Sequence, residues 1–347
     1  MRGKCLGDVI PAGARRRVGG GAGRVDYLPL PLMVFSSAAG MSTVSPAPRG
    51  ASIFPLAPGV RHMAVGALWF SVMTALVKVA GRTLHSQEIV LVRGAVMLAL
   101  STALVLRAGL SPWGAPDQRR LLVLRGAFGF AALSFFYSSL VHLPLAEANL
   151  IQYTNPVFTA ILAVWVLGER MGRREVACVA ASLAGVVLVV RPASLLGGGP
   201  SVVSPHAAAV ALAGALCSAT AYVIVRRIRG ESPLVIVFYL SLVTVVATLP
   251  FTLPQWEWPT LSEWLLLAAI GITTQVAQIN MTRGLQLEPA GRATAVAYLQ
   301  VVFAAIWGIA FFGERLDAWV IAGAVLILAS TVVLTRKISH RDTEAQR

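Results

Sequence analysis

The sequence predicts an all-α integral membrane protein with ten transmembrane helices, arranged as two inverted repeats of five helices each. Three observations lead to this fold class. The composition is too apolar for a water-soluble domain, ten separate segments are long and apolar enough to cross a bilayer, and one sequence pattern recurs 145 positions further along the chain.

The composition excludes an ordinary soluble protein. Of the 347 residues, 56% are hydrophobic and 13% are charged, whereas about a quarter of a soluble domain is charged. The net charge of +14, from 29 Lys and Arg against 15 Asp and Glu, would indicate nucleic-acid binding in a soluble protein. In a membrane protein it indicates basic cytoplasmic loops. We therefore expect a lipid bilayer and a small-molecule solute as partners, and no nucleic acid.

Ten apolar segments predict ten membrane spans. A span needs about 20 mostly apolar residues, and in hydrocarbon every backbone polar group must be paired within the segment, which predicts helices. The segments cover residues 63–80, 87–106, 121–140, 145–167, 175–190, 207–225, 234–253, 265–282, 293–312 and 319–334.

The basic residues between the spans predict the orientation. With the N-terminus in the cytoplasm, the outer loops contain only Arg82, Arg191 and Arg315, and the other loop and tail Lys and Arg residues fall inside. Cytoplasmic loops carry the excess of basic residues in membrane proteins. The sequence therefore predicts a multi-pass protein of the inner (cytoplasmic) membrane with both termini in the cytoplasm.

The internal repeat joins the two halves of the chain. The triplet Gly-Glu-Arg ends an apolar run at 168–170 and again at 313–315, and a gapless shift of 145 aligns identical residues through the fourth span of each half. Each repeat has five helices. Because five is odd, the second copy enters the membrane from the opposite side, and the repeat is inverted. Pairs of identical residues at this spacing include Gly126 and Gly271, Pro144 and Pro289, Tyr153 and Tyr298, Phe158 and Phe303, and Glu169 and Glu314.

The local role expected for Gly-Glu-Arg is structural, since a glycine after the last helical turn can adopt positive φ and end the helix. The repeats also set the expected domain organisation. It comprises a disordered basic extension over 1–59, a first repeat over 60–192, a Gly-rich linker over 193–205, a second repeat over 206–337 and a cytoplasmic tail over 338–347.

These motifs resemble one family. The stretch LPLAEANLIQYTNPVFTAILAVWVLGER is similar to the most recognisable segment of the EamA family of the drug/metabolite transporter superfamily, and SQEIVLVRG resembles the start of its second helix. The resemblance covers about residues 60–337. It implies a ten-helix carrier for small metabolites or drugs in the inner membrane. The second copy departs from the pattern, with Val301 where the first has Pro156.

The fourth span carries the candidate binding face. Asn149, Gln152, Tyr153 and Pro156 follow the spacing i, i+3, i+4, i+7 and share one side of a helix. Pro156 has no N–H, so the carbonyl of Gln152 loses its helical partner, which at bilayer depth requires burial in protein or a wet cavity. We expect this face to line a central cavity. Hydrogen-bonding between helices is the alternative.

Polar and aromatic residues of other spans complete the candidate substrate-binding set. Arg93 is open to two interpretations, because it can bind an anionic group or pair with Glu88. The further candidates are Trp69, Arg93, Tyr137, Asn155, Gln275, Gln278, Tyr298 and Gln300.

Several functions are disfavoured by missing motifs. The sequence has no GxxxxGK[ST] loop for ATP, no histidines at metal-ligand spacing and no recognisable catalytic set, so we expect no cofactor, no metal and no enzymatic activity. No acidic residue falls at the middle of a predicted span, where proton-coupled carriers commonly need a titratable group. This favours an exporter or exchanger that works by facilitated exchange or downhill export, and coupling through a group near the outer rim, such as Glu147, is the alternative. A membrane enzyme acting on lipid or isoprenoid substrates and a non-transporting scaffold are the alternatives.

The N-terminal extension has two interpretations. Its stretches GARRRVGGGAGR and SPAPRGASIFPLAPG show no helical period and are typical of disorder. A basic tail of this kind can contact anionic lipid. Alternatively, Met41 is the true start and the preceding residues are not part of the protein.

Overall fold

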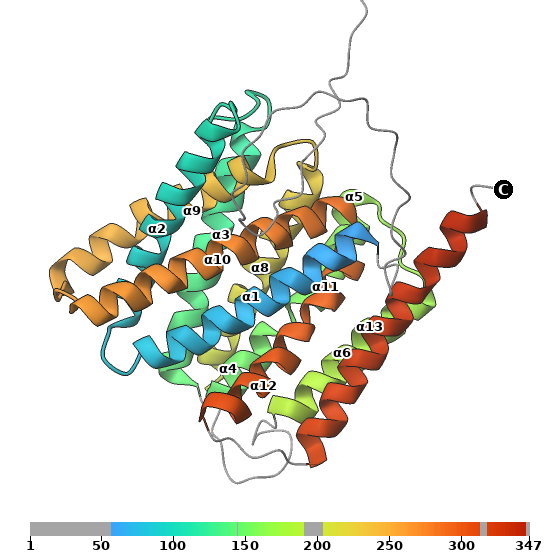
Figure 1. Ribbon diagram of the computed structural model, residues 1–347. Coiled ribbons are helices and arrows are strands. Elements are labelled where there is room, and N and C mark those ends of the chain that lie inside the picture. Colours follow the sequence, from blue (N-terminus) through green and yellow to red (C-terminus); the bar gives the residue numbers. More distant parts are fainter. Residues whose placement is uncertain (1–56, 144, 191–203, 313–317, 345–347) are drawn as a thin grey trace, which may run out of the picture. The chain divides into compact units, whose positions relative to one another are not determined.

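The computed structural model describes residues 57–143, 145–190, 204–312 and 318–344, and every regular element in these ranges is a helix (Figure 1). The expectation of an all-helical protein is therefore confirmed for this part of the chain. Most of the predicted N-terminal extension, most of the Gly-rich linker and the second Gly-Glu-Arg lie outside the described residues, as do the side chains of Tyr137 and Glu147.

The first half of the chain contains helices α1 to α6. Pro58 begins α1, where a missing N–H costs nothing, and Gly168, with φ of 66°, ends α5 in the left-handed conformation expected of the first Gly-Glu-Arg. The bounds are α1 Pro58–Ala80, α2 Ser86–Arg107, α3 Arg119–His142, α4 Leu145–Gln152, α5 Asn155–Leu167 and α6 Arg173–Val190.

The second half contains helices α8 to α13. Proline again occupies the first turn of α8 and α9, and α10 begins with a capping box in which Thr260 and Glu263 bond each other's backbone N–H. The bounds are α8 Pro205–Arg227, α9 Pro233–Thr252, the 3₁₀ turn η1 Leu253–Gln255, α10 Leu261–Leu287, α11 Ala290–Ala297, α12 Leu299–Phe312 and α13 Ala318–Glu344.

The fourth segment of each half is broken at an equivalent residue. The first break separates α4 from α5 at Tyr153 and Thr154, and the second separates α11 from α12 at Tyr298. The two tyrosines are 145 positions apart. Pro156 follows the first break, but Val301 holds the corresponding position after the second, so proline is not required for the interruption.

The packing of the helices is symmetric under exchange of the halves. In the first half α1 packs on α10 and α12 of the second, and in the second half α8 packs on the equivalent α3 and α5 of the first. Likewise α2–α10 contacts match α3–α9 contacts, while α2 packs on its own counterpart α9 and α6 on its own counterpart α13 (Figure 1). The repeat seen in the sequence is therefore also a repeat of tertiary contacts.

Equivalent glycines make these contacts close. A Cβ on Gly66 of α1 would lie 3.2 Å from the backbone of Met281 and 3.3 Å from that of Ala277. A Cβ on Gly214 of α8 would approach Ala132 and Phe136 at 3.4 Å, and these two residues precede Ala277 and Met281 by 145 positions. Small residues permit close helix approach in membrane proteins, and here they do so at matching places in both halves.

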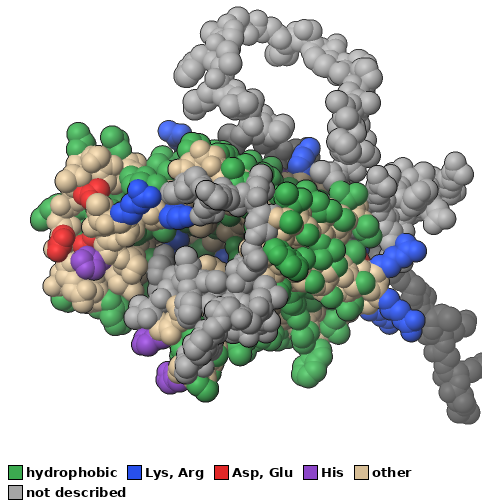
Figure 2. Space-filling model, turned by 90° about the horizontal axis from the view of Figure 1, so that it is seen from below, with side chains coloured by type: hydrophobic (Ala, Val, Ile, Leu, Met, Phe, Trp, Pro, Cys, Tyr) green, Lys and Arg blue, Asp and Glu red, His purple; other side chains and the backbone are tan. Residues whose placement is uncertain are grey.

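The surface and helix lengths are those of a membrane protein. Seven stretches of the described residues are long and apolar enough to cross a bilayer, and Trp165 and Phe311 are 84% and 72% exposed. Figure 2 shows hydrophobic side chains gathered in a broad patch on the right of the visible face, with the charged ones in small groups. A contiguous apolar exterior of this kind requires lipid rather than water. The seven stretches are Pro58–Ala80, Ser86–Arg107, Ala148–Leu167, Pro205–Arg227, Pro233–Gln255, Leu261–Leu287 and Ala290–Phe311.

Candidate functional site

A cavity of about 330 Å³ lies among the helices of both halves. Its lining comes from α1 to α5 in the first half and from α8 to α12 in the second. Nine residues of the candidate binding set line it, and these include all four residues of the candidate face on the fourth span. They are Arg93, Asn149, Gln152, Tyr153, Asn155, Pro156, Gln278, Tyr298 and Gln300.

Three members of the candidate set are placed otherwise. Trp69 is half-buried on α1 and does not line the cavity, although the next residue, Phe70, does. Gln275 is buried and donates from its amide nitrogen to the Ser101 hydroxyl at 2.8 Å, joining α10 to α2. Its position matches hydrogen-bonding between helices. The side chain of Tyr137 is outside the described part of the chain.

The two equivalent tyrosines meet where the broken helices cross. The Tyr298 hydroxyl donates to the backbone carbonyl of Tyr153 at 2.8 Å, and the two rings lie 6.5 Å apart. A broken helix exposes carbonyls that need a partner at bilayer depth. The second half therefore supplies the hydrogen bond that the first break requires, and both tyrosines line the cavity.

Amide side chains give the cavity its neutral polar groups. Gln152 donates to the Ser218 hydroxyl at 3.2 Å, so α4 is bonded to α8 across the halves. Asn155 accepts from the Thr159 hydroxyl at 2.9 Å. The side-chain oxygens of Gln152 and Gln278 are buried without a hydrogen-bond partner. These amides can therefore still accept a bond from a solute.

Two arginines line the cavity, and only one of them, Arg93, belongs to the candidate set. The other is Arg125 of α3, which is 2% exposed. Arg125 is the fifth residue of the predicted third span, and ionisable residues inside membranes usually mark function. Its position in the sequence could therefore have identified it as a candidate site residue. Other lining residues absent from the set include Phe70, Ser218, Tyr222, Thr274 and Thr294.

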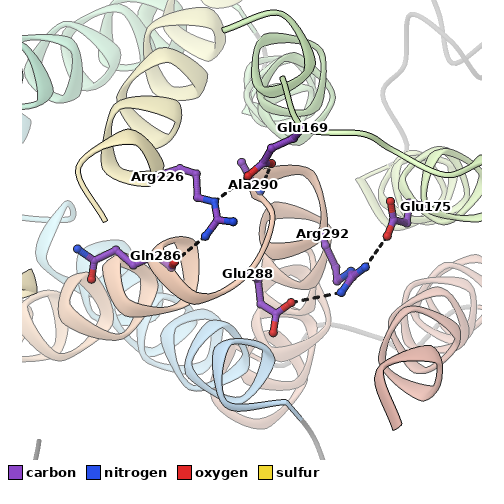
Figure 3. A network of polar contacts seen from close by, with 7 residues as sticks. All are labelled: Glu169, Glu175, Arg226, Gln286, Glu288, Ala290 and Arg292. Atoms are coloured by element: carbon purple, nitrogen blue, oxygen red, sulfur yellow. Dashed lines mark hydrogen bonds and ion pairs between the residues drawn. The ribbon is translucent and has the colours of Figure 1, made fainter. Parts of the chain in front are cut away.

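A second polar site joins the two halves away from the cavity (Figure 3). Glu169, of the first Gly-Glu-Arg, accepts from Arg226 of α8 at 2.7 Å and from the backbone N–H of Ala290, the first residue of α11, at 2.8 Å. Arg226 also donates to the carbonyl of Gln286 at the end of α10. The carboxylate thus binds the ends of α8 and α11 directly, and the end of α10 is joined to it through Arg226.

Arg292 of α11 extends this site. It pairs with Glu175 of α6 at 2.5 Å and with Glu288 at 3.4 Å. The seven residues drawn in Figure 3 are called the Glu169 network below; they are Glu169, Glu175, Arg226, Gln286, Glu288, Ala290 and Arg292. Their ion-pairing side chains are between 10% and 21% exposed, so water screens these pairs less than surface pairs.

Comparison with known proteins identifies relatives of this architecture. The sequence model of the EamA-like transporter family matches the chain twice, over residues 57–191 and 206–336. The pseudopaline exporter CntI of Pseudomonas aeruginosa (strain UCBPP-PA14) is 34% identical over 285 residues, which are 81% of this chain and 97% of that protein. Solute carrier family 35 member G1 of Mus musculus is 30% identical, over 80% of this chain and 78% of that protein.

Two further likenesses are more distant. The S-adenosylmethionine uptake transporter of Rickettsia prowazekii (strain Madrid E) is 24% identical, over 61% of this chain and 70% of that protein. A solved crystal structure superimposes with a TM-score of 0.70 at 21% identity, covering 81% of this chain and 98% of the other, and has the same fold. With the family matching both halves and most of the chain, the protein belongs to the EamA-like transporter family.

Proposed function

We propose that the chain is a secondary transporter that moves a small metabolite or drug by alternating access, as an exporter or exchanger, and that it is not an enzyme. The observation that carries the proposal is the polar cavity between two halves with symmetric contacts. Transporters built from inverted repeats bind solute near the midplane between the repeats. The name of the Pseudomonas relative, an exporter, supports the direction.

The proposal includes ten membrane crossings with the second repeat, over 206–337, inverted relative to the first, over 60–192. The symmetric helix contacts support the repeat, and the basic loops support an inner-membrane protein with both termini in the cytoplasm. On this topology the Glu169 network lies on the cytoplasmic side. Breaking it would open the cavity inward, so the network serves as the inner gate.

Labelling of equivalent residues tests the inversion. Asp117, just before α3, and Ser262, in the first turn of α10, are both exposed and lie 145 positions apart. Cysteines placed at these two positions, after Cys5, Cys178 and Cys217 are replaced by serine, are expected to react with a membrane-impermeant maleimide from opposite sides. Reaction of both from the same side would show that the repeats are parallel.

Metabolite profiling tests transport itself. Cells that overproduce the protein are expected to change the medium content of at least one small metabolite relative to an isogenic deletion strain. The double variant Gln152→Ala/Tyr153→Ala is expected to abolish the change, because it removes the polar face of the cavity.

A matched double variant controls for expression. Trp165 and Gln255 are an aromatic and an amide residue that are exposed and lie outside the cavity, so Gln255→Ala/Trp165→Ala is expected to retain transport. An unchanged metabolite profile in every strain would instead favour a scaffold.

A further inference from the structure

The two cavity arginines are buried and have no carboxylate partner within the described residues. Arg93 is 7% exposed and Arg125 is 2% exposed, and the Nε of each is buried without a hydrogen-bond partner. Within the described ranges neither guanidinium forms an ion pair with a carboxylate. Arg226 and Arg292, which are more exposed, do have carboxylate partners. The deeper arginines therefore lack the partners that the shallower ones have.

The acidic residue nearest to Arg93 in sequence is already bonded elsewhere. Glu88 lies in the first turn of α2 and is 1% exposed, and its Oε1 accepts from the backbone N–H of Glu257 at 2.8 Å. The alternative in which Glu88 neutralises Arg93 is thus not what the structure contains. Among the residues that the structure describes, Arg125 has Tyr222 and Gly129 as neighbours and no carboxylate ion-pair partner.

The helix contacts bring both arginines toward the same turn of α9. Gly94, next to Arg93, packs on Thr244, and a Cβ there would lie 3.4 Å from the threonine methyl group. Gly129, one turn after Arg125, packs on Leu240, which precedes Thr244 by one turn. A Cβ on Gly129 would also be 2.6 Å from Nη1 of Arg125. The missing side chain makes room for the guanidinium at the cavity wall.

The broken helices add positive potential to the same cavity. α5 begins at Asn155, which lines the cavity, and α12 begins at Leu299, next to the lining residue Gln300. Helix N-termini carry partial positive charge and favour anions. Broken membrane helices that point their N-termini at an anionic group of the solute are a known arrangement.

An unpaired arginine inside a membrane protein is costly, and two in one cavity also repel each other. A planar guanidinium fits the two oxygens of a carboxylate or phosphate. Resting on the proposed transport function, we propose that the solute is a small organic anion whose acidic group binds between Arg93 and Arg125. The open acceptors of Gln152 and Gln278 then bind N–H or O–H groups on the rest of the solute.

Efflux from loaded proteoliposomes tests the charge of the solute. Vesicles that contain the purified full-length protein are loaded with a soluble metabolite extract of the source organism, and the released compounds are identified by mass spectrometry. The wild type is expected to release organic acids, and the spectra distinguish carboxylates from phosphates. Arg93→Gln and Arg125→Gln are each expected to slow this release about tenfold or more, because each variant loses a charge-assisted hydrogen bond to the solute. Arg107→Gln, at an exposed arginine at the end of α2, is the control.

The empty protein provides an independent readout. If the two arginines serve to bind the solute, replacing either one relieves the cost of its desolvation and its repulsion with the other. In the absence of solute, both glutamine variants are therefore expected to unfold at a higher temperature than the wild type. A purely structural arginine would give the opposite shift.

The outcomes separate the two proposals. Release of no compound at all would contradict transport. Selective release of compounds without an acidic group, or acid release that persists in both arginine variants, would overturn the anion proposal and leave transport intact. Whether the released compounds carry an acidic group is measured on the unaltered protein. This measurement therefore tests the anion proposal even where an arginine variant does not fold.

Discussion

The substitution Gly323→Val is expected to lower the melting temperature of the purified protein by roughly 6–12 °C, which corresponds to about 3 kcal/mol of overpacking. A Cβ on Gly323 of α13 would lie 2.5 Å from the carbonyl oxygen of Gly185 in α6 and 2.7 Å from the Val189 side chain. A backbone carbonyl has no rotamer with which to move aside. The two helices would have to separate along their contact.

Thermal unfolding in detergent, followed by tryptophan fluorescence, measures this effect. Gly323→Ala is expected to give a smaller decrease, because it adds one methyl group rather than a branched side chain. Gly230→Ala serves as the control, since nothing lies within 4 Å of a Cβ at that position. If Gly323→Val and Gly230→Ala have the same melting temperature, α6 and α13 do not approach as closely as described.

The substitution Glu169→Gln is expected to favour a conformation in which the cavity is open on the side of the Glu169 network. The population of this conformation relative to the closed one is expected to rise by about 5- to 30-fold. The change removes the charge that pairs with Arg226 and weakens the bond from Ala290. A loss of about 1–2 kcal/mol between the halves gives a shift of that size.

Access to the cavity reports this shift. Ser218 lines the cavity, and Ser218→Cys, in the background without native cysteines, is expected to react faster with an impermeant thiol reagent applied from the cytoplasmic side when Glu169→Gln is present. Glu257→Gln removes an exposed carboxylate outside the network, and it should leave the rate unchanged. Equal rates in all three proteins would mean that the network does not close the cavity.

The sequence carries the helical architecture and the repeat because both depend on local patterns. Apolar segments of sufficient length predict the helices. The shift of 145 residues relates Ala132 and Phe136, which Gly214 contacts, to Ala277 and Met281, which Gly66 contacts. The break at Tyr298 is different. No proline follows it, and what the structure shows there is a tertiary contact, in which the Tyr298 hydroxyl donates to the carbonyl of Tyr153. A contact between residues 145 positions apart leaves no local signal.

The candidate site divides in a similar way. The spacing of Asn149, Gln152, Tyr153 and Pro156 places them on one face, and this face lines the cavity because turn hydrogen bonds from Thr154 and Val157 carry the chain across the break. Helical spacing on α10, however, does not decide whether an amide meets a cavity or a neighbouring helix. Gln278 lines the cavity and Gln275 bonds α2, a difference that depends on which helices pack against α10.

The short helix α11 behaves mechanically as a rod. Its eight residues span about 12 Å, with the Ala290 N–H held by Glu169 at one end and the Tyr298 ring in the cavity beyond the other. A short helix of this kind moves as one unit, so a displacement at one end is felt at the other. On the proposed function, we expect a solute that displaces Tyr298 also to disturb the Glu169 hydrogen bond, and loosening of that bond to move the tyrosine.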